Sequence, residues 1–345
     1  MKLQILTELP QGIGGLAAHQ LYQVLDGPTL IHLRGECEPP LFVSVLLHGN
    51  EIGGWDGARA LLDRYAGRTL PRSLSLLIGN VEAARFRVRM LENQPDYNRI
   101  WRGGDSLEAG IATEVTKEMR RRGVFASIDV HNNTGVNPHY AVVTQMHPAT
   151  LRLARTFSRV AVYVRQPDTT QSRAFEDFCT TIAVESGRPG EQWGTDHVIN
   201  LLETCLRWDA LPQSMPHDLD LYHTVARVKV PDDVHFGFSP GNLDLRLLGE
   251  LEHLNFQELN AGTLVGTVRN GLDRPLLVTD DDGRDVFDDY FELKGDKLRL
   301  AKAVVPSMFT DNVRIIRQDC LCYLMERVSA PYSPDSMRSR TRPKK

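Results

Sequence analysis

Short apolar runs alternate with amphipathic segments through the first 207 residues, and this alternation constrains the fold more than any other feature of the sequence. The apolar runs have the length and continuous hydrophobicity of strands buried on both faces of a sheet; they are LFVSVLL (41–47), LSLLI (74–78), ASIDV (126–130) and TIAV (181–184). The segments between and after them have apolar residues at helical spacing; they cover 54–65, 107–122, 148–159 and 190–207. Such alternation predicts an α/β fold, with a mostly parallel or mixed sheet and helices on both of its faces.

The pattern changes after residue 207. Residues 208–220 are rich in proline and polar side chains, which is typical of a linker. From 221 to 329 the chain has short β-like pieces separated by Gly, Asp and Asn, which predicts a smaller β-rich C-terminal domain. The last residues, 330–345, are polar and basic without apolar periodicity, and they predict a disordered tail. We therefore expect an α/β domain over 1–207, followed by a linker, a β-rich domain and a tail.

Composition and charge argue against two classes of partner. The 345 residues carry a formal net charge of −4, and acidic and basic residues alternate along most of the chain, so we expect no nucleic-acid surface and no membrane surface. No apolar stretch approaches the ~20 residues needed to cross a bilayer, and the N-terminus lacks the apolar run of a secretory signal. Five scattered cysteines predict reduced thiols. Together these features predict a cytoplasmic protein; they do not decide whether it forms a homo-oligomer.

Two histidines and a glutamate follow predicted strands at their C-terminal ends. His48 and Glu51 come directly after the run 41–47, and His131 ends the run ASIDVH. Ligands bind at the carboxyl ends of strands in such sheets, and two histidines with one glutamate are a common catalytic zinc set that leaves one position for water. Asp129, two residues before His131, is placed to orient an imidazole. A chance pair on a surface helix is the alternative for His48 and Glu51, and His139 is a weaker candidate because it follows no predicted strand.

A third carboxylate and a group of arginines complete the candidate site. Glu185 follows the run TIAV and therefore faces the same rim of the sheet, where it could take a proton from water and give one to a leaving amine. The alternative is a charge that complements the dipole of the following helix. The segment GNVEAARFRVRMLENQPDYNRIW is rich in arginine, which suits the binding of a carboxylate or an oxyanion. Composition alone does not say which of these arginines points inward.

In order along residues 40–207, the motifs HGNE, GNVEAARFRVRMLENQPDYNRIW, DVHNNTG and VESG resemble the succinylglutamate desuccinylase/aspartoacylase family, which is related to the zinc carboxypeptidases. The resemblance implies a zinc carboxypeptidase-like fold and one Zn²⁺ per chain, bound by His48, Glu51 and His131. It further implies Glu185 as the general base and acid and Arg89 as the group that polarises the scissile carbonyl. The residues that it implies for binding a substrate carboxylate are Asn98, Arg99 and, at a looser spacing, Arg173.

Taken with this resemblance, these residues predict a zinc-dependent hydrolase that cleaves the amide bond of an N-acyl amino acid or a related small carboxylate-bearing substrate. A carboxypeptidase or peptide amidase that acts on short peptides is the alternative among enzymes. A non-catalytic metal- or ligand-binding module on the same fold is the alternative of another class, and it predicts that Glu185 lies away from the metal. Two departures from the family pattern, Val81 in place of Pro and an extra residue before Asn98, lie in the segment that would read the substrate.

Overall fold

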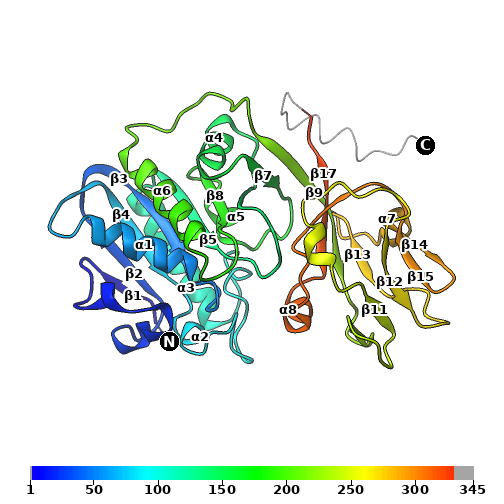
Figure 1. Ribbon diagram of the computed structural model, residues 1–345. Helices are drawn as coiled ribbons and strands as arrows, with labels where there is room; N and C mark the ends of the chain where they lie inside the picture. Colours follow the sequence, from blue (N-terminus) through cyan, green and yellow to red (C-terminus); the bar gives the residue numbers. More distant parts are fainter. Residues whose placement is uncertain (1, 330–345) are drawn as a thin grey trace. The chain divides into compact units, whose positions relative to one another are not determined.

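The computed structural model describes residues 2–329, which form two compact units (Figure 1). The first unit comprises residues up to 132 together with 139–220. The second comprises 221–329 together with the short segment 133–138. The predicted tail, 330–345, lies outside the described residues.

The first unit is built on a mixed sheet whose strand order is β1-β2-β4-β3-β5-β8-β6-β7. The central strands β4, β3, β5 and β8 run parallel, whereas β2 and β6 pair antiparallel with β4 and β8. The strands are β1 (Gln4–Leu6), β2 (Thr29–Leu33), β3 (Gly35–Val45), β4 (Leu70–Ile78), β5 (Ala126–His131), β6 (Tyr140–Val143), β7 (Val160–Tyr163) and β8 (Thr181–Glu185). The predicted runs thus form the four parallel strands at the centre of the sheet.

Helices cover both faces of this sheet (Figure 1). Phe42 of β3 packs in a cluster with residues of α3 (Leu107–Arg122) and α5 (Gln171–Phe175). Val45, three residues further and therefore on the other face, lies against Gly54 of α1 (Gly53–Arg64). On that face α1 contacts α6 (Gln192–Arg207), which in turn contacts α4 (Pro148–Phe157). The shorter helices are η1 (Ile13–Gly15), η2 (Ala18–Gln23) and α2 (Val81–Arg85). The predicted α/β fold is therefore confirmed.

Residues 208–220, predicted as a linker, lie along the first unit. Arg72 donates hydrogen bonds from Nη2 to the carbonyl oxygens of Trp208 and Asp209, at 2.8 and 3.5 Å. Near the end of the segment, Arg155 pairs with Asp218 at 2.5 Å. These contacts keep the proline-rich segment on the surface of the first unit.

The second unit contains two sheets. In one, β9 (Asp220–Lys229) pairs antiparallel with β17 (Cys322–Arg327) and β13 (Leu277–Thr279), and β16 (Val305–Ser307) pairs with β17. The other has the order β10-β11-β12-β15-β14, with β10 (Phe236–Gly237), β11 (Leu245–Leu247), β12 (Leu264–Val268), β15 (Lys297–Leu300) and β14 (Phe291–Lys294). Its short helices are η3 (Leu251–Leu254), α7 (Phe287–Tyr290) and α8 (Val313–Gln318). The β-rich character expected of the C-terminal region is therefore confirmed.

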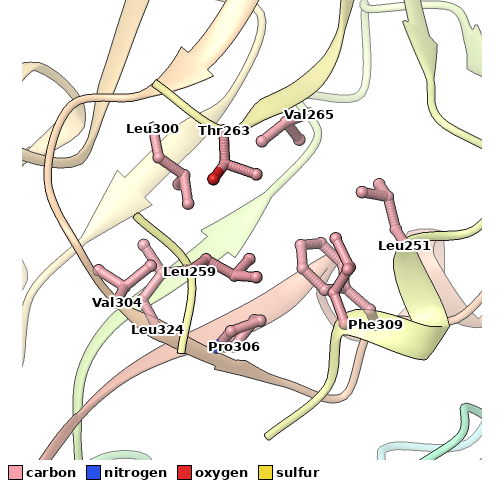
Figure 2. Close-up of a pocket in the computed structure, with 10 residues that line it drawn as sticks. Leu251, Leu259, Thr263, Val265, Leu300, Val304, Pro306, Phe309 and Leu324 are labelled. Carbon is pink, nitrogen blue, oxygen red and sulfur yellow. The ribbon is translucent and has the colours of Figure 1, made fainter. Parts of the chain in front are cut away.

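A small cavity in the second unit is lined by apolar side chains (Figure 2). Leu251, Leu259, Val265, Phe309 and Leu324 are among its lining residues, and Thr263 contributes the one side-chain oxygen that Figure 2 draws there. Such a lining offers little to a polar ligand, so we assign the cavity to the core of this unit. Among the described residues, no helix is both long enough and apolar enough to cross a membrane.

The close approach of α1 and α6 generates a stability prediction. A Cβ atom at Gly57 would lie 2.5 Å from Cγ1 and 2.8 Å from Cβ of Val198, a fully buried side chain. We expect Gly57→Ala to lower the free energy of unfolding by about 1–3 kcal/mol, because the two helices must separate. Gly110 of α3 is the matched control, since nothing lies within 4 Å of its Cβ position. Gly110→Ala should raise that free energy by about 0.5–1 kcal/mol. Urea denaturation checks both values, and equal effects of the two substitutions would contradict the packing.

Candidate metal centre

A tight turn after β3 places His48 and Glu51 at the carboxyl edge of the sheet. Leu46, fully buried, has a φ of 56°, a left-handed conformation that a leucine adopts only when its surroundings impose it. Asn80 N donates a 2.7 Å hydrogen bond to Leu46 O, and Gly49 N donates to Arg89 O at 3.1 Å. A Cβ atom at Gly49 would lie 2.2 Å from the backbone of Ala83, so only glycine fits there. The turn is thus fixed from both sides before α1 begins.

The three predicted ligands lie together. His48 Nδ1 lies 2.7 Å from Glu51 Oε1, and His131 Nδ1 lies 2.7 Å from Glu51 Oε2. All three side chains are buried, and one donor atom from each lies within 4.8 Å of the others. His139 lies outside this group. The two imidazoles therefore share one carboxylate, and their Nδ1 atoms face the same point.

The other nitrogen of each imidazole faces a second carboxylate. His48 Nε2 donates to Asp96 Oδ1 at 3.0 Å, and His131 Nε2 donates to Asp129 Oδ2 at 2.8 Å. Asp129 is itself held by Ser44, whose hydroxyl donates to Oδ1 at 2.7 Å. Metal-bound histidines usually donate their remaining N–H to a carboxylate in this way, which fixes the ring and makes it a better ligand. The arrangement fits a divalent cation bound through both Nδ1 atoms and Glu51.

Electrostatics favour a positive charge at this place. Burial opposes the protonated form of both histidines, but nearby carboxylates outweigh it: Asp129 and Glu51 raise the pKa of His131 well above its ordinary value. Glu51 and Asp96 likewise raise the pKa of His48 against the opposing effects of burial and Arg89. Burial alone would raise the pKa of Glu51, yet the two histidines hold it well below its usual range. The site therefore attracts cationic charge, either as protons on imidazole or as a metal ion.

Glu185 ends β8 directly beside the cluster. Its Cα is the register partner of that of His131 in the parallel pair β5–β8. The Oε2 atom of Glu185 is buried and has no hydrogen-bond partner among the described residues. Burial raises the pKa of Glu185 to about 7, and the charge of Glu51 acts in the same direction against the histidines and Arg89. A carboxylate in this condition is suited to exchange a proton near neutral pH.

Arg89 enters the site from the loop after α2. Its side chain is 8% exposed, with Nη2 2.9 Å from Asp96 Oδ2 and Nη1 3.6 Å from Glu51 Oε1. Asp96 therefore links Arg89 to His48, and its Oδ1 also accepts from Asn98 N at 2.7 Å. Sequence reasoning missed Asp96. Its position two residues before the Asn98-Arg99 pair was the available signal, but a loop has no periodicity that shows which side chains point inward.

Asn98 and Arg99 differ in their surroundings. The Asn98 side chain is buried, with Oδ1 accepting from Gln171 N at 3.1 Å and Nδ2 lying 3.2 Å from His131 Nε2. Arg99 is half-buried, and its Nη1 donates to Asn98 O at 2.9 Å. The structure thus brings the Asn98 amide to His131 and leaves part of Arg99 accessible.

Arg173 is the predicted site residue that the structure does not bring to the cluster. It lies in α5, and its Nη2 donates to the carbonyl oxygens of Val164 and Arg165 at 2.7 and 2.9 Å. Its Nη1 pairs with Glu176 at 3.1 Å and donates to Thr144 O at 3.4 Å. These contacts hold the segment after β7 against α5.

Solved structures of similar fold cover most of the chain. They include succinylglutamate desuccinylase from Vibrio parahaemolyticus (TM-score 0.59, 15% identity, 88% of each chain) and murine aminoacylase 3 (0.55, 17%, 85% of this chain and 97% of that chain). A product-bound ectoine utilization protein from Ruegeria pomeroyi is also similar (0.56, 15%, 87% and 88%). No protein-family model matches the sequence, and no curated protein does. The likeness confirms, at the level of the fold, the resemblance expected from the motifs.

The orientation of His131 by Asp129 generates a metal-binding prediction. Asp129→Ala removes the acceptor of His131 Nε2, so we expect the affinity for Zn²⁺ to fall about 10–100-fold. Competition with a chromogenic chelator at fixed pH measures this change. Asp244 of the second unit is the control, because it is also buried and accepts from His235 N at 2.9 Å. Asp244→Ala should leave the affinity unchanged, and equal losses in both variants would contradict the assignment.

Proposed function

We propose that this chain, which has the fold of the succinylglutamate desuccinylases and of aminoacylase 3, belongs with them functionally as a zinc-dependent hydrolase. Its reaction is the cleavage of the amide bond in an N-acyl amino acid or a related small carboxylate-bearing substrate. One observation carries the proposal: two buried imidazoles and the Glu51 carboxylate face one point beside a further carboxylate, that of Glu185, whose buried Oε2 atom has no hydrogen-bond partner among the described residues.

His48 Nδ1, His131 Nδ1 and Glu51 would hold the zinc ion, and a set of two histidines and one glutamate leaves a coordination position open. Zinc bound there supplies Lewis acidity, which lowers the pKa of a water molecule and polarises a carbonyl. Asp96 and Asp129 keep the two rings oriented by accepting from their Nε2 atoms. These carboxylates also strengthen the imidazoles as ligands.

Glu185 is the proposed general base and then the general acid. The attacking water gives its proton to the Glu185 carboxylate as the oxygen–carbon bond forms. The same proton passes to the amide nitrogen as the carbon–nitrogen bond breaks, which releases a carboxylic acid and an amine; the acid then loses its remaining proton to give a carboxylate and an ammonium. A pKa raised to about 7 by burial suits both transfers, since the group can accept and return a proton near neutral pH. A non-catalytic module would not require Glu185 beside the cluster, so this placement supports an enzyme.

Arg89 is proposed to stabilise the negative charge that develops on the carbonyl oxygen. Its guanidinium is buried and fixed by Asp96 at 2.9 Å, so it needs little reorganisation during the reaction. Arg99, whose Nη1 donates to Asn98 O, is the proposed partner of a substrate carboxylate. The names of the similar structures, which include desuccinylases and an aminoacylase, support an acyl group attached to an amino acid as the substrate. We also propose a cytoplasmic location, because all five cysteines are free.

The role of Glu185 generates a kinetic prediction. Glu185→Gln keeps the size of the side chain but cannot take a proton, so we expect kcat to fall about 10²–10⁴-fold with zinc content unchanged. A screen of N-acyl amino acids and short peptides, with metal analysis of the same samples, measures both quantities. Glu203→Gln, at the exposed pair with Arg64, is the matched control and should retain full activity. Retained turnover in Glu185→Gln would remove this residue from the mechanism, and a preference for peptides would favour a peptidase.

The different surroundings of Arg99 and Arg173 generate a paired prediction. Arg99→Met should raise KM about 10-fold or more, because a charged hydrogen bond to the substrate is lost. Arg173→Met should instead lower the free energy of unfolding by about 1–3 kcal/mol with KM little changed, since this arginine holds backbone carbonyls. Steady-state kinetics and urea denaturation on both variants separate the two roles. A large rise in KM for Arg173→Met would restore the substrate-binding role expected from the sequence.

A further inference from the structure

His139 packs against the turn that follows Glu185. The residue after it, Tyr140, is the register partner of Glu185 in the antiparallel pair β6–β8, so His139 lies beside the residues that leave the end of β8. Its side chain is buried, and Ser158 Oγ donates to its carbonyl oxygen at 2.7 Å. His139 thus belongs to the surroundings of Glu185 although it is no part of the metal cluster.

The turn that contains Gly187 packs tightly against the His139 ring. Gly187 has a φ of +80°, and a Cβ atom there would lie 2.9 Å from His139 Nε2 and 3.0 Å from Glu191 Oε2. Gly194, at the start of α6, packs against the same turn, because its Cβ position lies 2.1 Å from Ser186 O. Only glycine satisfies both positions, so the backbone of Ser186 and Gly187 lies directly on His139 and α6.

Hydrogen bonds hold the other side of the same turn. Asn132 Nδ2 donates to Ser186 Oγ and to Gly187 O, both at 2.9 Å. Ser186 N donates to His131 O at 2.9 Å. The turn after Glu185 is therefore enclosed between Asn132, next to a predicted ligand, and the His139 ring.

Aromatic residues fix the His139 ring in turn. Its centroid lies 4.1 Å from that of Trp193, with an interplanar angle of 34°, and 4.4 Å from that of His197 at 77°. His197 Nδ1 donates to Trp193 O at 2.8 Å, which ties these two residues of α6 together. Trp193 is 57% exposed, so its ring covers His139 from the solvent side.

The His139 ring acts through packing and not through charge. Burial, with the neighbouring charge of His197, lowers the pKa of His139 to about 4 against the opposing effect of Glu191. Neither ring nitrogen has a hydrogen-bond partner in the described part of the chain. His139 is therefore neutral at neutral pH, and its contacts with Gly187 and Trp193 are contacts of packing.

We propose that His139 and Trp193 are positioning residues, which hold the Ser186–Gly187 turn and thereby keep the Glu185 carboxylate at the metal centre. The catalytic consequence rests on the proposed function, since it requires Glu185 to transfer the proton. A misplacement of about 1 Å at the reacting groups can cost about 10²-fold in rate. The two residues thus set kcat through the position of Glu185.

Hydrogen–deuterium exchange and steady-state kinetics on the zinc-loaded, full-length protein test this inference. Trp193→Ala should fold, because more than half of this side chain is exposed. His139→Ala removes the imidazole ring that packs against the turn. In both variants we expect faster exchange of the amides in 185–191, a kcat at least about 5-fold lower, and KM and zinc content within twofold of the wild type. Trp193→Phe should restore most of the loss. Gln192→Ala is the matched control, because this exposed residue of the same helical turn directs its side-chain amide to Asp196 at 3.0 Å.

Wild-type exchange in 185–191 for Trp193→Ala would overturn the inference, and so would an unchanged kcat in an active enzyme. A general loss of exchange protection across the first unit, equal in all segments, would also overturn it, since that result indicates a merely structural role. Failure of the wild-type protein to hydrolyse any N-acyl amino acid or peptide would instead contradict the proposed function. In that case the exchange rates of the amides in 185–191 alone decide whether His139 and Trp193 hold the turn.

Discussion

The structure of the site depends on one carboxylate shared by two buried imidazoles. Glu51 lies 2.7 Å from Nδ1 of both His48 and His131, in a place from which water is largely excluded. Burying such groups is costly unless opposite charges and hydrogen bonds compensate. Hydrogen bonds from the two imidazoles to Glu51, Asp96 and Asp129 provide such compensation, and a divalent cation bound to the Nδ1 atoms and Glu51 would provide it as well. The strained turn at Leu46 and the close approach at Gly49 bring these groups together.

From this centre, hydrogen bonds extend outward in two directions. Asp96 joins His48 to Arg89 and to the backbone of Asn98, so the loop after α2 is positioned by the same cluster that would hold the metal. On the other side, Asn132 joins His131 to the turn after Glu185. The proposed oxyanion partner and the ligands are thus parts of one connected network, which also holds the backbone turn directly after the proposed base, Glu185.

The sequence predicts the centre of this network well, because parallel strands end at one edge of a sheet. Continuous apolar runs identified β3, β5 and β8, and the polar residues that follow them therefore lie together. Other features carry no such signal. The four-residue strands β6 and β7 are too short for periodicity to identify, and Asp96 lies in a loop. Arg173 was only the nearest match to a family arginine, at a looser spacing, and its guanidinium holds backbone carbonyls. Residues 133–138 belong to the second unit, although the residues directly before and after them in the sequence belong to the first.

The most direct test of the account is X-ray absorption at the zinc edge on protein loaded with one equivalent of Zn²⁺. We predict nitrogen and oxygen ligands at about 2.0–2.2 Å, with scattering from two imidazoles and none from sulfur. His131→Ala should remove one imidazole from that spectrum. Sulfur scattering at about 2.3 Å, or failure to retain one zinc ion per chain after dialysis, would contradict the claim that the buried His48, Glu51 and His131 form the metal centre.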